Sequence, residues 1–203
     1  MLQSQTVESN TLELLKSLMQ KEYLDSFVLV GGTALALQLG NRESIDLDLF
    51  SNTDFASNEL LTSLLIDYQI VVNNQLPQTL ITTINHVKVD FIKFHYPFIR
   101  PFLVIENIRM ASLEDIAAMK LDAITGRGSK KDFYDLFFLL QHYSIDELFS
   151  FYTEKYPHQT TFHVARSLTY FDDAEIQPSP IVFDKTITWE TVKQKIISVI
   201  KAL

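Results

Sequence analysis

The chain has 203 residues, of which 25 are acidic and 17 basic, so its formal net charge is −8. This charge disfavours non-specific binding to nucleic acid or an anionic membrane, but it permits a polyanionic substrate that arrives with Mg²⁺ or meets a local basic patch. The absence of cysteine excludes disulfides, thiolate catalysis and cysteine-ligated zinc or iron–sulfur clusters. No apolar run approaches the ~18 residues of a membrane span, and residues 1–10 lack a signal-peptide pattern, so we expect a cytoplasmic protein without a membrane partner.

The first half of the sequence predicts an α/β unit. An amphipathic helix precedes a short and wholly apolar strand, which runs through Gly31-Gly32 into an apolar helix that ends at Gly40. A helix and several β-rich runs follow. The expected helices are 10–24, the one ending at Gly40, and 57–67; the expected strands are 27–30, 45–49, 68–73, 79–85, 87–95 and 102–105.

The second half of the sequence predicts helices. Ser112 is a favourable N-cap with Asp115 at the third helical position, so a helix should run from there to about Thr125. Further helices are expected over 131–142, 144–156, 160–169 and 188–201. The predicted fold class is therefore α+β, with a small mixed β-sheet core and flanking helices over residues 1–108, followed by a packed C-terminal helical region over 109–203.

Two acidic residues share one face of the strand at 45–49. Alternation should direct Ile45, Leu47 and Leu49 to the core, which leaves Asp46 and Asp48 together on the opposite face. Paired carboxylates repel each other unless a cation lies between them, and oxygen ligands favour Mg²⁺ or Mn²⁺. A solvated strand edge is the alternative interpretation.

Two further features strengthen the metal interpretation. Gly31-Gly32 lies between a strand and a helix, where backbone N–H groups can approach a phosphate and Thr33 could add a hydroxyl, although an ordinary turn is the alternative. The sequence there is neither a Walker motif nor a dinucleotide fingerprint. Asp90 alternates with Val89 and Phe91 on a later strand, and a third carboxylate from a neighbouring strand would complete a two-metal site.

Together these residues resemble the DNA polymerase β-like nucleotidyltransferase superfamily. The superfamily pattern stands here as Val30-Gly31-Gly32, then Asp46-Leu47-Asp48, then Val89-Asp90-Phe91. Many superfamily members have Gly-Ser where this chain has Gly31-Gly32.

Charged residues at the predicted helical junction indicate which family within the superfamily the sequence resembles. Lys120 lies on the apolar stripe of its helix, from which it could either extend to solvent or reach a phosphate. Asp132 and Asp135 share a helix face, where they could compensate the helix dipole or serve the site. With the GGTAL and DLDLF segments, Lys120 and the segment Lys131–Leu136 resemble the AbiEii/AbiGii toxin family over residues 27–142.

The resemblance implies a nucleotidyltransferase that acts as the toxin of a toxin–antitoxin or phage-defence pair. It would transfer a nucleoside monophosphate from an NTP to an RNA hydroxyl, with tRNA 3′ ends the leading acceptors. The implied roles are metal binding by Asp46, Asp48 and Asp90, phosphate binding by Gly31, Gly32, Thr33 and Lys120, orientation of Lys120 or an acceptor by Asp132 or Asp135, and RNA-backbone contact by Arg127, Lys130 and Lys131.

Two other functional classes remain open from the sequence. One is a nucleotidyltransferase of the same fold that modifies a small molecule or a protein hydroxyl. The other is a non-catalytic module that binds an NTP or a partner protein. The acidic surface favours both over an enzyme with a large RNA footprint.

Overall fold

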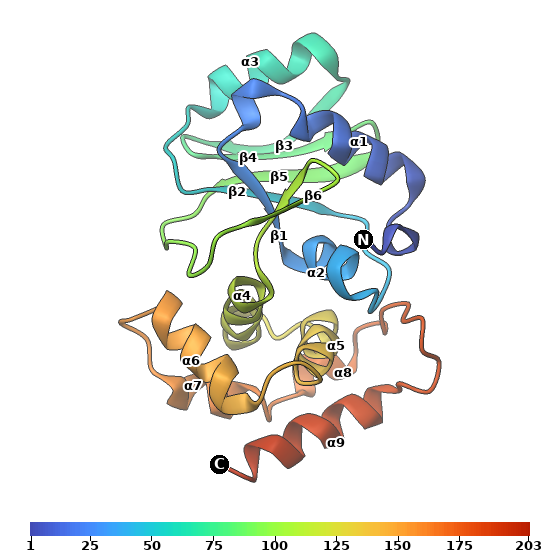
Figure 1. Ribbon diagram of the computed structural model, residues 1–203, viewed down its shortest axis with the longest axis vertical. Helices are drawn as coiled ribbons and strands as arrows, with labels where there is room; N and C mark the ends of the chain where they lie inside the picture. The colour runs from blue at the N-terminus through green and yellow to red at the C-terminus, as the bar shows by residue number, and fades with distance from the viewer.

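A computed structural model describes residues 1–203 and confirms the predicted α+β class. Seven strands form one mixed sheet in the order β3-β4-β5-β2-β1-β7-β6, and the later helices gather on one side of it (Figure 1). The strands are β1 (Phe27–Val30), β2 (Leu47–Ser51), β3 (Ile70–Leu76), β4 (Thr79–Ile84), β5 (Val87–Lys93), β6 (Leu103–Ile105) and β7 (Ile108–Met110).

The helices fall close to their predicted ranges. Three of them begin after a residue whose side chain caps the helix: Ser112, which accepts a hydrogen bond from the Asp115 N–H, and likewise Ser144 and Thr188. The α-helices are α1 (Ser9–Met19), α2 (Gly31–Leu39), α3 (Ser57–Asp67), α4 (Leu113–Gly126), α5 (Lys130–Leu139), α6 (Ile145–Lys155), α7 (Thr161–Ser167), α8 (Asp172–Glu175) and α9 (Trp189–Ile200), with 3₁₀ turns at Ser4–Thr6 and Glu22–Leu24.

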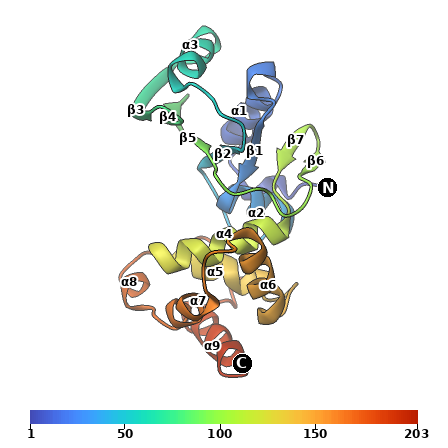
Figure 2. The same cartoon turned by 90° about the vertical axis from the view of Figure 1, so that its left-hand side faces the viewer.

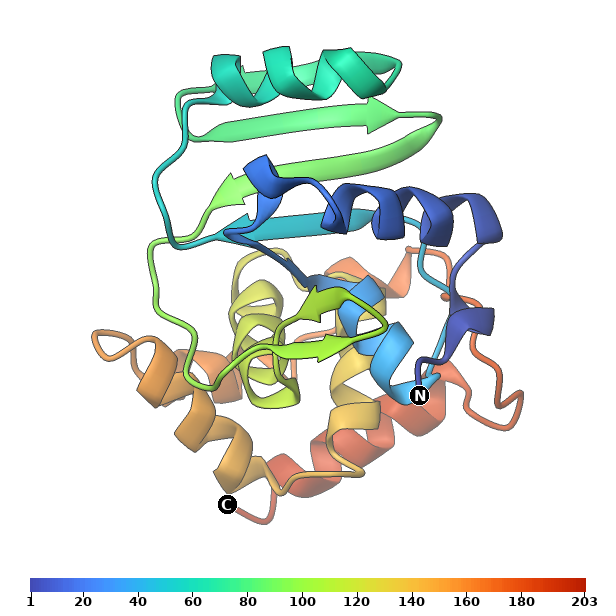
Figure 3. The ribbon, with the colours of Figure 1, turned by 45° about the horizontal axis from the view of Figure 1, so that its top comes forward.

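The centre of the sheet explains why β1 is apolar throughout. It pairs antiparallel with β2 and parallel with β7, and all four of its residues are buried. On β2 the burial alternates, so that Leu47 and Leu49 enter the core while Asp48 and Phe50 face the other way. The strands β3 and β4, with α3, form the end of the molecule farthest from the helical half (Figure 3).

Three local predictions differ from the structure. Ile45 is 60% exposed, because the chain becomes a regular strand only at Leu47. The first helix ends at Met19 and gives way to a 3₁₀ turn before β1. The short strand β7 was not predicted, since its three residues are too few to show a period.

The two halves share one hydrophobic core of 47 buried residues. Helix α2, which follows β1, packs against both α4 and α5 at the junction (Figure 2). Along the chain, the last strand of the sheet is β7, which ends at Met110, and α4 begins at Leu113 after a two-residue connection. None of the helices combines the length and the apolar character needed to cross a bilayer.

A buried ion pair fastens the segment between β5 and β6 to the helices. The Nζ atom of Lys155 on α6 lies 2.7 Å from Oδ1 of Asp115 on α4, and both side chains are fully buried. The Asp115 carboxylate also accepts hydrogen bonds from the N–H groups of Ile99 and Arg100, at 3.0 and 3.1 Å. This carboxylate therefore joins two helices and a loop at one point.

We expect Lys155→Met to lower the free energy of unfolding by about 3–5 kcal/mol, because it leaves the Asp115 charge buried without its cation. The matched control is Lys16→Met, which breaks a pair with Glu106 whose side chains are 41% and 47% exposed and should cost less than about 1 kcal/mol. Urea unfolding followed by circular dichroism measures both. Equal losses in the two variants would contradict this role.

Candidate active site

Three aspartates lie together where β2 and β5 run side by side. These strands are parallel and adjacent, and their register pairs Asp48 directly with Asp90. Asp46 precedes β2 by one residue and is half-buried, as is Asp48. Because side chains alternate along a strand, these aspartates form one acidic cluster on one face of the sheet, which is called the acidic group below.

The charges around this acidic group are only partly balanced. Burial and repulsion from Asp90 raise the pKa of Asp48, although Lys120 and Lys88 oppose the shift. The Lys88 ammonium lies 2.7 Å from Oδ2 of Asp90. The other oxygen of that carboxylate, Oδ1, is buried and has no hydrogen-bond partner.

The acidic group suits a divalent cation whose remaining coordination positions are filled by a bound ligand. An unpartnered buried carboxylate oxygen is costly, and an oxygen-preferring cation beside Asp48 and Asp90 would satisfy it. No three His, Cys, Asp or Glu side chains lie close enough together to enclose an ion by themselves. Mg²⁺ is commonly bound by one or two carboxylates together with substrate phosphates, so the residues present suit that mode of binding.

The glycine turn at the start of α2 is shaped by its neighbours. Gly31 has φ +69°, and a Cβ there would lie 2.4 Å from Oδ2 of Asp48. A Cβ on Gly32 would lie 2.3 Å from Nη2 of Arg42. Glycine at both positions lets a carboxylate and a guanidinium approach the same stretch of backbone.

Thr33 has a different orientation from the one expected of a phosphate ligand. Its side chain is buried, and its hydroxyl donates a hydrogen bond to the Asp46 carbonyl oxygen and accepts one from the Ser44 hydroxyl. The hydroxyl therefore holds the chain that leads into β2 and is turned away from the cleft. Serine at the preceding position would meet Arg42, which is consistent with Gly32 in this chain.

Lys120 lies at the centre of a buried charge network. Its Nζ atom lies 2.9 Å from Oδ1 of Asp132 and 2.7 Å from Oδ2 of Asp135. Arg42 binds Asp135 in a bidentate manner, with Nε 2.7 Å from Oδ1 and Nη2 2.9 Å from Oδ2. Arg127 donates to Asp132 at 3.0 and 3.2 Å. The network therefore joins α4 and α5 to the loop between α2 and β2.

The network fixes the charge state of its members. Burial alone would raise the pKa of Asp135, but Arg42 and Lys120 hold it below its ordinary value. Burial alone would likewise lower the pKa of Lys120, but the two carboxylates keep it raised. The pKa of Asp132 is lowered as well, so the three cations and two carboxylates of the network all remain ionised at neutral pH.

Arg42 was not identified from the sequence. It lies in a loop without periodicity, between the C-cap Gly40 and the acidic strand, and only its position four residues before Asp46 could have marked it. Asn41 beside it donates to the same Asp135 carboxylate at 3.0 Å. Of the predicted basic patch, Lys130 is buried and donates to the Glu175 carbonyl oxygen, so it does not face the cleft.

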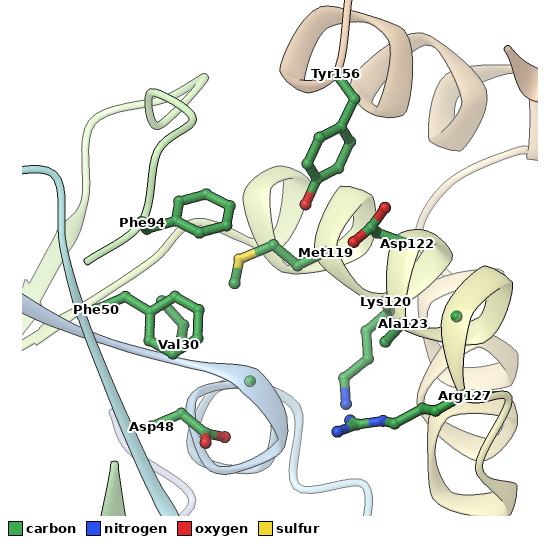
Figure 4. A pocket seen from close by; sticks show the side chains of 12 residues that line it. Val30, Asp48, Phe50, Phe94, Met119, Lys120, Asp122, Ala123, Arg127 and Tyr156 are labelled. Carbon is green, nitrogen blue, oxygen red and sulfur yellow. The ribbon is translucent and has the colours of Figure 1, made fainter. Parts of the chain in front are cut away.

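A cavity of about 410 Å³ lies between the sheet and α4, and a smaller one of about 50 Å³ adjoins it. The Asp48 carboxylate lies across the cavity from Lys120 and Arg127 (Figure 4). Asp132 and Asp135 lie behind these cations and do not line either space. The smaller cavity is lined by Gly31, Gly32, Arg42, Ser44, Asp46, Asp48, Lys120, Arg127 and Lys131.

Comparison with known proteins agrees with this geometry. Residues 13–199 match the family described as "Nucleotidyl transferase AbiEii toxin, Type IV TA system". The chain belongs to the AbiEii toxin nucleotidyltransferase family. This finding confirms the resemblance noted from the glycine turn, the acidic strand and the helical lysine.

Relatives of this AbiEii-family chain include an uncharacterized protein of Aquifex aeolicus, which is 34% identical over 194 residues. The alignment covers 90% of this chain and 90% of that protein. Similar solved structures share the fold. A putative nucleotidyltransferase from Helicobacter pylori has a TM-score of 0.57 at 20% identity, with coverage of 96% of this chain and 95% of that one. MenT4, a nucleotidyltransferase toxin of Mycobacterium tuberculosis, has a TM-score of 0.62 at 14% identity, with coverage of 97% and 86%.

We expect Gly31→Ala to destabilise this AbiEii-family protein by at least about 1 kcal/mol, because the left-handed backbone is strained and the added Cβ meets Asp48. Gly126→Ala, at the end of α4 with no atom within 4 Å of its Cβ, is the matched control and should be neutral or stabilising by up to about 1 kcal/mol. Thermal and urea unfolding measure both. The assignment fails if the two variants behave alike.

We also expect Asp132→Asn to lower the free energy of unfolding more at neutral pH than at acidic pH. Burial by itself would raise the pKa of Asp132, but Lys120 and Arg127 outweigh burial and lower it. The ionised carboxylate therefore stabilises the fold above the ordinary Asp pKa of ~3.9, and this contribution is lost as the pH falls below that value. The parent-minus-variant difference in unfolding free energy should therefore shrink between pH 7 and pH ~3. A difference that grows on acidification would contradict the charge assignment.

Proposed function

We propose that the protein is a Mg²⁺-dependent toxin that transfers a nucleoside monophosphate from an NTP to an RNA hydroxyl, with the 3′ end of a tRNA as the leading acceptor. The observation that carries this proposal is the opposition of Asp48 to Lys120 and Arg127 across a cavity that begins at a glycine turn, with Asp90 paired to Asp48 on the neighbouring strand. Membership of the AbiEii family supports a nucleotidyltransferase toxin with an antitoxin partner.

The proposed roles follow from the charges. Asp48 and Asp90, with Asp46 beside them, would hold Mg²⁺ or Mn²⁺. When bound, this cation neutralises negative charge on the phosphates. The N–H groups of the glycine turn and the cations Lys120 and Arg127 would bind the triphosphate. The buried carboxylates Asp132 and Asp135 would act by positioning Lys120.

The transfer itself is an in-line displacement. The acceptor oxygen bonds to the α-phosphorus, the bond from that phosphorus to the bridging oxygen breaks, and pyrophosphate leaves. The hydroxyl proton would pass to water beside Asp90. Most of the protein's contribution is therefore positioning and charge stabilisation.

The basic residues at the mouth of the smaller cavity support a nucleic-acid acceptor. Arg127 has a side chain that is 62% exposed, and Lys131 beside it is exposed as well. They offer an acidic protein one local contact for an RNA backbone. An RNA and NTP substrate pair also favours the cytoplasm as the place of action.

The direct test incubates the protein with each labelled NTP and total RNA, with and without Mg²⁺, and resolves the products on a gel. Mg²⁺-dependent label on RNA supports the proposal. Label on a protein or a small molecule would show that the acceptor is of that class and not an RNA. Absence of label under all conditions would favour a non-catalytic binding module.

Asp48→Asn should lower this labelling on the order of 100-fold or more while the fold survives, because a metal-binding charge is lost from the reacting centre. Arg127→Ala should raise the apparent KM for the NTP about tenfold, the cost of one charged hydrogen bond. Lys195→Ala, an exposed cation on α9, is the control and should leave both values unchanged. Full activity of Asp48→Asn would rule out the proposed metal role.

A further inference from the structure

The acidic group has a lysine beside its three aspartates. Lys88 lies two residues before Asp90 on β5, so both side chains leave the same face of that strand. The parallel register that pairs Asp48 with Asp90 places Lys88 level with Asp46, which directly precedes β2. The ammonium is therefore part of the same cluster as the carboxylates.

Lys88 is the one hydrogen-bonding partner of a buried carboxylate. Its Nζ atom lies 2.7 Å from Oδ2 of Asp90, and the other oxygen, Oδ1, has no partner. The Asp90 side chain is 10% exposed, whereas that of Lys88 is 46% exposed. Removing the only cation from a carboxylate buried to this extent is much less favourable than breaking a surface ion pair. The contact therefore fixes the ammonium on Oδ2.

Lys88 lies at the end of the acidic group away from the proposed triphosphate ligands. Lys120 and Arg127 line the two cavities that begin at the glycine turn, and Lys88 lines neither. It lines a third cavity of about 270 Å³ together with Asp46 and His86. Asp46 also lines the smaller cavity, so it stands between the triphosphate side and the Lys88 side. The third cavity thus leaves room for an acceptor on the side opposite the triphosphate.

The charges of the acidic group suit one divalent ion. With three carboxylates and one ammonium, two negative charges remain uncompensated, and one Mg²⁺ carries that charge. Oδ1 of Asp90 is free to receive it, but Oδ2 already binds Lys88. A second divalent ion would have to displace the ammonium or bind against its repulsion.

We propose that Lys88 serves as the second cation of the site, so that a single divalent ion binds with each NTP and the ammonium takes the place beside Asp90 that another ion would fill in a two-metal centre. This inference rests on the proposed function and differs from the two-metal centre expected from the sequence. An ammonium at this point stabilises the negative charge that develops on the acceptor oxygen as its proton passes to water.

The test counts the Mn²⁺ ions that the full chain binds with α,β-methylene analogues of ATP, GTP, CTP and UTP, using the paramagnetic resonance signal of the free aqueous ion. The parent complex should bind one ion. Lys88→Met should bind two, because it frees Oδ2 of Asp90 and adds one uncompensated negative charge. Lys88→Arg keeps the cation and should bind one.

Lys93→Met is the matched control, because Lys93 lies on the same strand and pairs at 3.0 Å with Asp54, outside the acidic group. It should leave the count at one ion. Urea unfolding shows whether each variant is folded during the titration, and the count for the parent tests the proposal even if Lys88→Met does not fold.

Two ions on the parent complex, or one ion on folded Lys88→Met, would overturn the role of Lys88 and leave the proposed function in place. A parent that binds none of the analogues, or binds them without Mn²⁺, would overturn the proposed function itself, and the role of Lys88 would fall with it.

Discussion

The structure depends on one buried carboxylate, Asp135, which is fully enclosed and bound by Arg42 and Lys120. A charge in that position is unfavourable unless both cations remain in place, so the loop after α2 and the helix α4 cannot separate without exposing or stranding it. The same contact sets Arg42 against Gly32 and directs Lys120 to the cleft. Stability of the junction and placement of the proposed phosphate ligands thus have one cause.

The charge balance across the cleft follows from this arrangement. On the helical side, three cations (Arg42, Lys120 and Arg127) face two buried carboxylates and leave a surplus of positive charge. On the sheet side, three aspartates face Lys88 and leave a surplus of negative charge. A cation and a polyphosphate together would compensate both surpluses at once, which is the composition of a metal–NTP complex.

Much of this site could be predicted from the sequence, because strand alternation fixes which side of β2 and β5 carries Asp48 and Asp90. Helical spacing similarly placed Lys120 on a buried face. Arg42 could not be found in this way, since it lies just outside a regular element and reaches the cleft through tertiary contacts. The inward turn of the Thr33 hydroxyl depends on the Asp46 carbonyl oxygen, which no sequence pattern locates.

In the proposed arrangement, the acidic and cationic sides of the cleft bind one metal–nucleotide complex between them. A crystal structure with Mn²⁺ and a non-hydrolysable NTP analogue tests it most directly, because anomalous scattering locates the ion independently of the ligand. We expect Mn²⁺ on the carboxylates of Asp48 and Asp90, with the triphosphate on the side of Lys120 and Arg127. Mn²⁺ bound elsewhere, or a triphosphate that avoids this cleft, would contradict this arrangement.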